Sequence, residues 1–359
     1  MAMRVSAAAA LAAGLTVLAA GAVAAEFALT EVPSVTEVPI AQLKAGAIAF
    51  SDQPGDGLID PAIGFIRYED WGNARPNHRQ FLSLYPGYTE PNVDYIVDGV
   101  RRRYRERLHM YVAEARFVIA RAPGSIELAR LATLPFVEQL DPAIKHRPAT
   151  AEDLARPKGP KAIHNQHPQR KWCEGRPTVI CIQSTYKLEG RLPVGIALAN
   201  KIREGSRTIS DTLEFTSELT VLSSAEIGEL GLARLTRLET PATGALEQSI
   251  FHVNQVMQFG KLLAVFQAHP DDPKKTVVSV FTALGIESSL LGKQKQYAKV
   301  PVLRNLVPAQ VLAGKSSFNS GRSLSAGLPV YARNQIKAIA ALLESGGQAA
   351  ARPAANPVR

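Results

Sequence analysis

The most reactive side chains in this sequence are its two cysteines, Cys173 and Cys181. His164 and His167 lie just upstream, which gives the spacing H-x2-H-x5-C-x7-C and four possible zinc ligands in one short stretch. That spacing matches none of the usual zinc-finger patterns, and C-x7-C differs from the C-x-x-C motif of redox enzymes. A glycine and a proline between the cysteines favour a turn that would bring them together. We therefore predict a Cys173–Cys181 disulfide, with two free thiols or a zinc site as the alternatives.

Residues 1–25, MAMRVSAAAALAAGLTVLAAGAVAA, have the organisation of a secretory signal peptide. One positive charge, Arg4, precedes an alanine-rich apolar run, and small residues follow where a signal peptidase would cut. The run is short of the ~20 strongly apolar residues of a stable membrane span, so an uncleaved anchor is the alternative. We predict an exported, soluble protein of the periplasm or extracellular space, where a disulfide would persist.

A second group of candidate metal ligands follows a hydrophobic strand in AVFQAHPDD, residues 264–272. This stretch resembles the metal motif of the LmbE-like zinc de-N-acetylases. The resemblance implies that His269 and Asp272 would bind zinc and that Asp271 would act as the general base on a metal-bound water. Pro273 stands where that family usually has glutamate, and no histidine follows His269. A hairpin turn is the competing interpretation, because proline and aspartate are also turn residues.

Other polar residues could line a binding cavity, but they give no catalytic arrangement. His252, Asn254 and Gln258 would share one side of a strand, either facing a ligand cavity or forming a wet face. No serine lies in a G-x-S-x-G motif, and no convergent set of titratable residues stands at workable spacing. We therefore predict no catalytic residues, no cofactor and no metal, with zinc-dependent amide hydrolysis through His269, Asp271 and Asp272 as the alternative.

Residues 91–122 have the most regular helical periodicity, since apolar residues recur there at steps of three and four. We predict an amphipathic helix over this range, within an N-terminal region of residues 26–160. Its remaining surface would carry a basic block that either contacts an anionic surface or is simply solvated: Arg101, Arg102, Arg103, Arg105 and Arg107. The formal net charge of +9 aids solubility and fits anionic lipid or another anionic envelope surface as partner. Because an exported protein rarely meets nucleic acid, we expect no nucleic-acid partner.

The strand pattern begins after a proline-rich basic stretch, 156–172, that we take as a boundary. Apolar and polar residues alternate strictly in 178–190 and 211–223, which predicts a sheet with one face on a core and one in water. Glu214 and Glu218 would share the wet face roughly 13 Å apart, too far for a pair of glycosidase carboxylates. After the second strand, Ser-Ser-Ala-Glu predicts the capped start of a short helix.

Residues 246–287 predict three further strands, the last two joined as a hairpin through HPDDPKK. A closing helix over 329–344 and a disordered tail over 346–359 complete the chain. The order of elements predicts an α+β fold: an antiparallel sheet with helices packed on one face, in a C-terminal domain of residues 165–345, preceded by a helical or irregular N-terminal region.

Two resemblances accompany this prediction. The closing helix over a curved antiparallel sheet is similar to helix-grip, START-like lipid-binding domains, and implies an apolar cavity between helix and sheet. The stretch VPVLRNLVPAQVLAGKSSFNSG, residues 300–321, with the block around it over about 165–345, resembles an uncharacterised family of exported bacterial proteins, a domain of unknown function. We expect an exported envelope protein or an apolar-ligand or lipid-binding protein rather than an enzyme.

Overall fold

The computed structural model describes part of the 359-residue chain, namely residues 27–52, 59–60, 65–67, 94–97, 100–103, 108–155, 173, 179–187, 212–253, 257–287 and 324–346. The predicted signal peptide, the stretch 300–321 and the tail beyond residue 346 lie outside these ranges, so the predictions for them stand as predictions.

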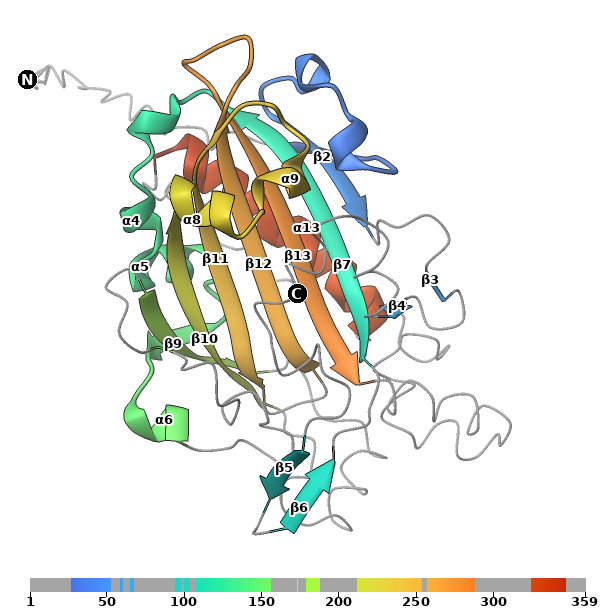
Figure 1. Cartoon of the computed structure of the whole chain (residues 1–359), viewed down its shortest axis with the longest axis vertical. Coiled ribbons are helices and arrows are strands. Elements are labelled where there is room, and N and C mark those ends of the chain that lie inside the picture. The colour runs from blue at the N-terminus through green and yellow to red at the C-terminus, as the bar shows by residue number, and fades with distance from the viewer. Residues whose placement is uncertain are drawn as a thin grey trace, which may run out of the picture.

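One large β-sheet dominates the described chain (Figure 1). Its strands follow the spatial order β1 (Ala28–Glu31), β2 (Ala47–Asp52), β7 (Leu108–Ile119), β13 (Thr276–Glu287), β12 (Met257–Ala268), β11 (Ala242–Val253), β10 (Thr212–Ser223), β9 (Val179–Lys187) and β8 (Lys145–Pro148). Neighbours on this path are antiparallel except β1 and β2, which are parallel. The short strand β4 (Phe65–Arg67) pairs with β7 and with β3 (Ile59–Asp60). β5 (Asp94–Val97) pairs with β6 (Val100–Arg103) in a separate two-stranded sheet.

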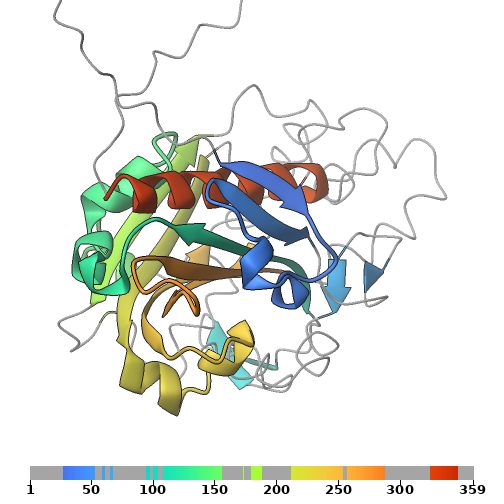
Figure 2. The same ribbon diagram turned by 90° about the horizontal axis from the view of Figure 1, so that it is seen from above.

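Helices lie on both sides of the large sheet (Figure 2). The described helices are η1 (Val35–Glu37), η2 (Ile40–Gln42), η3 (Pro123–Ser125), α4 (Leu128–Leu131), α5 (Leu134–Leu140), α6 (Ala151–Ala155), α8 (Ser224–Glu229), α9 (Ala233–Thr236) and α13 (Leu324–Glu344). The long helix α13 runs along one face, which we call the α13 face, and α8 and α9 lie on the opposite face. The predicted α+β class with an antiparallel sheet is confirmed. No described helix is both long enough and apolar enough to span a membrane.

The main core lies between α13 and the sheet. Buried residues of α13 recur at helical spacing on the side toward the sheet: Ala332, Ile336, Ile339, Ala340 and Leu343. They meet alternate residues of the strands, including Tyr111, Phe117, Ala264, Phe266 and Val280. A second apolar cluster on the opposite face joins Ile227, Leu232 and Leu235 of the α8–α9 region to Leu263, Val265 and Phe281. Both faces of the central strands are therefore buried.

The helix predicted over residues 91–122 was wrong, because its described residues form β5, β6 and β7. β7 is buried on both faces: Tyr111, Phe117 and Ile119 face α13, while Met110 and Val112 face the other way. A strand that is apolar on both faces loses the alternation that would identify it, and its apolar residues can then fall at three- and four-residue steps by chance. β7 also brings this N-terminal segment into the same sheet as β13.

Local signals in the C-terminal half predicted the structure well. Ser223 accepts a hydrogen bond from the backbone N–H of Glu226, whose carboxylate accepts one from the N–H of Ser223, which is the expected capping box at the start of α8. β12 and β13 form the predicted hairpin, closed by a hydrogen bond from the His269 N–H to the Lys275 carbonyl. α13 begins at Leu324, five residues before the predicted start at residue 329. Pro329 therefore lies inside the helix rather than at its first position.

Candidate ligand-binding site

A small cavity of about 50 Å³ lies between the sheet and α13. Strands β10 to β13 form its floor, α5 and the loop before β8 form one wall, and α13 closes it. The apolar lining includes Val137, Leu140, Ile144, Phe215, Ile250, Leu262 and Leu284. The polar lining includes Asp141, His146, Gln248, Lys261, Thr282, Tyr331 and Gln335. A mostly apolar wall with a few polar groups is the usual composition of a small-molecule site.

The two ends of α13 are held differently. At its C-terminal end the Arg121 guanidinium donates to the Leu343 carbonyl at 3.2 Å, and the Ala120 N–H donates to the Glu344 carboxylate at 2.9 Å. Near the other end, Pro329 has no N–H and so removes one hydrogen bond from the helix interior. The cavity lies under Tyr331, just after this proline. Beside the cavity the helix is anchored as well, because Arg333 pairs with the carboxylates of Glu31 at 2.6 Å and Asp52 at 3.3 Å. Pro329 therefore weakens the backbone of the helix at this end without leaving the end unanchored.

His146 projects from β8 on the α13 face and reaches the cavity lining. It stands opposite Ser184 of β9, and its Nδ1 lies 2.8 Å from the Ser184 Oγ. Burial lowers the pKa of His146, although the nearby Asp141 carboxylate opposes that shift. The imidazole is therefore neutral at pH 7, since its ordinary pKa is already about 6.5. Its Nε2 is buried and makes no hydrogen bond of ordinary length and angle with a described residue.

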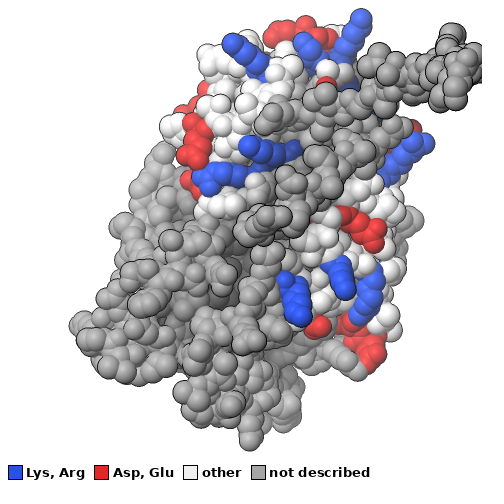
Figure 3. Space-filling view, turned by 180° about the vertical axis from the view of Figure 1, so that it is seen from behind, with Lys and Arg blue, Asp and Glu red and all other residues white. Residues whose placement is uncertain are grey.

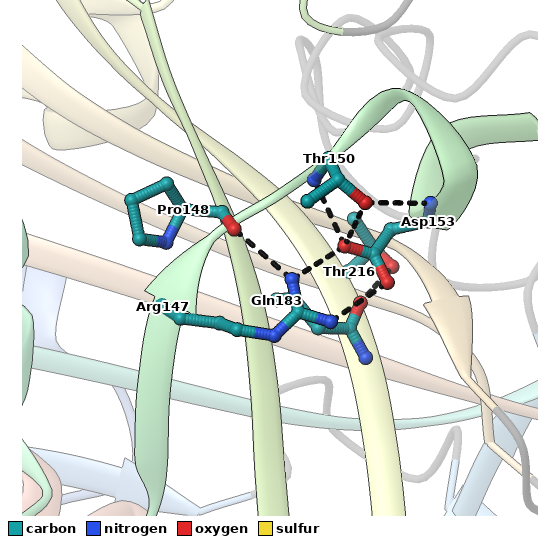
Figure 4. A network of polar contacts seen from close by, with 6 residues as sticks. All are labelled: Arg147, Pro148, Thr150, Asp153, Gln183 and Thr216. Carbon is teal, nitrogen blue, oxygen red and sulfur yellow. Dashed lines mark hydrogen bonds and ion pairs between the residues drawn. The ribbon is translucent and has the colours of Figure 1, made fainter.

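A polar network ties the end of β8 to α6 and so restricts the strand that carries His146. On the other side of the strand, the Arg147 guanidinium donates two hydrogen bonds to the Asp153 carboxylate, at 2.6 and 2.9 Å (Figure 4). Asp153 also accepts hydrogen bonds from the N–H and hydroxyl of Thr150, just before α6. These donors hold the pKa of Asp153 well below its usual range, with Arg147 the largest cause. The network ties the end of β8 to α6, which restricts an otherwise exposed edge strand.

Tyr331 closes the cavity from α13. The residue is partly exposed, and its hydroxyl hydrogen-bonds to the Asp141 carboxylate. Burial and that carboxylate raise the pKa of Tyr331 above its usual range, so the phenol stays protonated. Gln335 Nε2 donates to the Tyr331 hydroxyl at 3.2 Å. The Tyr331 hydroxyl therefore links α13 to the wall of the cavity at Asp141.

The cavity role predicted for the polar row His252, Asn254 and Gln258 stays a prediction, because the structure does not describe their side chains. His252 lies in β11 opposite Thr216, and Gln258 lies in β12, whereas Asn254 lies outside the described residues. Sequence reasoning missed His146 and its partner Ser184. They are 38 positions apart in the chain and meet only because β8 pairs with β9. No local spacing signals such a pair.

The predicted disulfide between Cys173 and Cys181 is confirmed, so the free-thiol and zinc alternatives for these cysteines were wrong. Cys173 adopts a left-handed backbone conformation with φ of 64°. Its N–H donates to the Glu218 carboxylate at 3.1 Å. The disulfide thus places the Cys173 N–H, a hydrogen-bond donor, on the face of the sheet opposite α13.

The polar side of β10, predicted to be wet, is buried, so that part of the prediction was wrong. Glu218 is only 2 % exposed, and Thr216 and Thr220 beside it are buried as well. On the neighbouring strands the Lys261 ammonium lies 2.7 Å from the Glu247 carboxylate, and both side chains are buried. The alternation of residues did predict which side chains share a face. The alternation could not predict that other parts of the chain cover the polar face of β10.

The described residues give the zinc-hydrolase alternative no support. The Asp271 N–H donates to Nδ1 of His269, which makes His269 part of the turn itself. The Asp272 carboxylate pairs with Lys275 at 3.1 Å, and this hydrogen bond lowers the pKa of Asp272. Nowhere in the described part of the chain do three histidine, cysteine, aspartate or glutamate side chains gather as a metal site would require.

The basic block does not lie on a helix. Arg101, Arg102 and Arg103 belong to β6, and Arg105 and Arg107 lie outside the described residues. On the view that shows the α13 side, the described basic and acidic side chains are interspersed (Figure 3). A single-sign patch for an anionic surface is therefore not visible among the described residues of that view. Contact of these five arginines with an anionic surface stays a prediction.

No family model matches the chain, and no curated protein matches it. Among solved structures, the chain is similar to the Zhui aromatase/cyclase from Streptomyces sp. R1128, with 12 % identity and a TM-score of 0.32 over 66 % of this chain and 94 % of that one. It is also similar to the lipid transfer and protein localization domain of human StarD13 (DLC2), with 7 % identity and a TM-score of 0.22 over 66 % of this chain and 97 % of that one. Similarities this low support no functional argument.

Proposed function

We propose that this protein is an exported, non-catalytic binding protein that holds a small apolar molecule or a lipid between α13 and the sheet. The observation that supports this most directly is the cavity under Tyr331, with apolar walls and a few polar groups at one side. The disulfide supports export, because such bonds persist in oxidising compartments.

The size of the cavity constrains how binding would occur. Its volume of about 50 Å³ holds a few waters or a few carbon atoms. Pockets for drug-sized molecules measure about 300–1,000 Å³. A larger ligand therefore enters only if the part of α13 near Pro329 moves outward. The anchoring of the other end through Arg121 and Glu344 makes that end the natural fixed point.

A glycine in the floor allows a specific test. A side chain added at Gly260 would meet Ile250 Cδ1 at 2.9 Å and Leu284 Cδ2 at 3.0 Å, and both of these residues line the cavity. Because the contacted atoms are the far ends of flexible side chains, Gly260→Val should be accommodated by pushing them into the empty space. We expect it to reduce binding of an apolar fluorescent probe at least several-fold.

Gly228→Val is the matched control, because nothing lies within 4 Å of a side chain added there, in α8 on the opposite face. It should leave probe binding unchanged. Native mass spectrometry of the protein isolated from its own cells provides an independent measurement, with a bound small apolar molecule expected. Absence of any such molecule, together with no probe binding by the unmodified protein, would overturn the proposal.

A further inference from the structure

The polar groups of the cavity are concentrated at one side, and they define what kind of molecule could bind. We propose that His146 selects an apolar ligand that carries an uncharged oxygen group, a hydroxyl or a carbonyl, at the end placed against β8. This inference rests on the proposed function, and it adds the chemical class of the ligand and the residue that recognises it.

One ring nitrogen of His146 is committed and the other is available. Nδ1 lies 2.8 Å from the Ser184 Oγ, a contact that fixes the plane of the ring. Nε2 is buried in a side chain that lines the cavity, and no described atom meets it with the length and angle of a hydrogen bond. The Asp141 backbone also contacts the ring and, like the Asp141 carboxylate, opposes the lowering of the His146 pKa by burial. A buried polar atom without a partner is costly, so a ligand oxygen placed beside Nε2 would be stabilised there. Because the Ser184 hydroxyl can donate or accept, Nε2 can serve either a carbonyl or a hydroxyl.

The charges around this end disfavour an anionic ligand. Asp141 lines the same side of the cavity, and Glu138 of α5 also acts on His146 electrostatically. A ligand carboxylate would therefore meet the Asp141 carboxylate and a neutral imidazole, with the charge of Glu138 nearby. Lys261 also lines the cavity, but its ammonium already pairs with the Glu247 carboxylate at 2.7 Å. Fatty acids thus fit less well than the corresponding alcohols or ketones.

The same arrangement gives a cationic ligand little advantage. The Asp141 carboxylate already accepts the hydrogen bond of the Tyr331 hydroxyl. The Gln248 amide donates to the Ser217 hydroxyl at 3.2 Å, so it is also engaged. His146 Nε2 is therefore a polar atom of the lining that can recognise an oxygen group.

The test compares small ligands that share one chain length and differ only at the end: hexanol, hexanoate, hexylamine and hexane. Binding would be measured on the full mature protein at neutral pH by displacement of an apolar fluorescent probe. We expect hexanol to bind roughly three- to tenfold more tightly than hexane, the gain of one neutral hydrogen bond, and more tightly than hexanoate or hexylamine. Nitrogen NMR of the His146 ring should show a shift at Nε2 with hexanol and none with hexane.

Two variants of His146 make the result specific. His146→Leu should abolish the advantage of hexanol while hexane still binds, and His146→Gln, which keeps a distal amide, should retain part of it. Lys145→Leu, at the exposed neighbouring position of β8, is the control and should change nothing. Equal binding of all four ligands, or preference for hexanoate or hexylamine, would overturn this inference and leave the binding function intact. Failure of every ligand to bind would overturn both.

Discussion

Both faces of the large sheet are buried and both carry an apolar cluster, but the face opposite α13 also holds a buried charge pair. Adjacent residues of β11 show the contrast: Leu246 belongs to the apolar core under α13, and Glu247 lies on the opposite face against Lys261. Apolar contacts are non-directional and can adjust to one another, whereas each buried charge depends on a particular partner. The packing on the α13 face can therefore include a cavity at a modest cost in stability. The opposite face requires complete pairing.

The largest effect should come from breaking one charge pair on the opposite face. Glu247→Leu leaves the Lys261 ammonium buried without its carboxylate at 2.7 Å, and it also removes the acceptor of the Ser249 hydroxyl. We expect a loss of about 3–5 kcal/mol in the free energy of unfolding. Urea denaturation with the disulfide intact would measure it.

The double variant Glu247→Leu with Lys261→Met separates pairing from simple loss of volume. Removing both charges should recover at least half of the stability, because no buried charge is then left alone. The matched control on the α13 face is Leu246→Ala, which should cost about 2–5 kcal/mol. If the effects of Glu247→Leu and Lys261→Met are simply additive, the described difference between the faces does not hold.

Along α13, the contrast between the tightly packed part and the cavity should appear as a gradient of stability. Ile336 is 1 % exposed and contacts the core, whereas Tyr331 is 37 % exposed and borders the cavity. We expect Ile336→Ala to cost about 2–5 kcal/mol. Tyr331→Ala should cost distinctly less in urea denaturation. Equal losses at the two positions would mean that the helix packs uniformly and that the cavity end is not its weaker part.

The disulfide should stabilise the opposite face by two separable effects. Closing a loop between residues eight positions apart contributes about 2.5 kcal/mol in the chain-entropy model. The disulfide also holds the Cys173 N–H against the buried Glu218 carboxylate. We expect Cys173→Ala with Cys181→Ala to cost more than the loop term alone, as measured by urea denaturation.

Glu218→Gln tests the second effect, because it weakens the acceptor and leaves the disulfide in place. In that background the cysteine replacements should cost about 1 kcal/mol less than in the unmodified protein. An unchanged cost would show that the disulfide acts through loop closure alone.

The difference between the faces also explains what the sequence could predict. Alternation, turn residues and a capping signal predicted β9 to β13, their hairpin and the closing helix, because these signals are local. β7 was missed because both of its faces are apolar, and the burial of Glu218 was missed because it depends on chain packed over the sheet. The His146–Ser184 pair depends on the pairing of β8 with β9, which no local spacing encodes. The local elements of the C-terminal half were thus predictable, whereas β7, the burial of the polar face and the polar residues of the site were not.

The smallest effect is expected at the edge of the sheet. The Arg147–Asp153 pair there is partly exposed, so losing it should cost less stability than losing a fully buried pair. The pKa of Asp153 is lowered by Arg147, so the folded state binds a proton there less readily than the unfolded chain. The stabilisation is complete above the ordinary aspartate pKa of about 3.9 and is lost as the pH falls below it. Because the Arg147 side chain is 52 % exposed, we expect Asp153→Asn to cost only about 1 kcal/mol at pH 7, with the cost shrinking below about pH 4. Glu152→Gln, at the exposed neighbouring position, is the control variant, and its stability would be measured by urea denaturation at both pH values.

A cost for Asp153→Asn that stays constant down to low pH would show that the hydrogen bonds between Asp153 and Thr150, rather than the charge of Asp153, hold the edge strand.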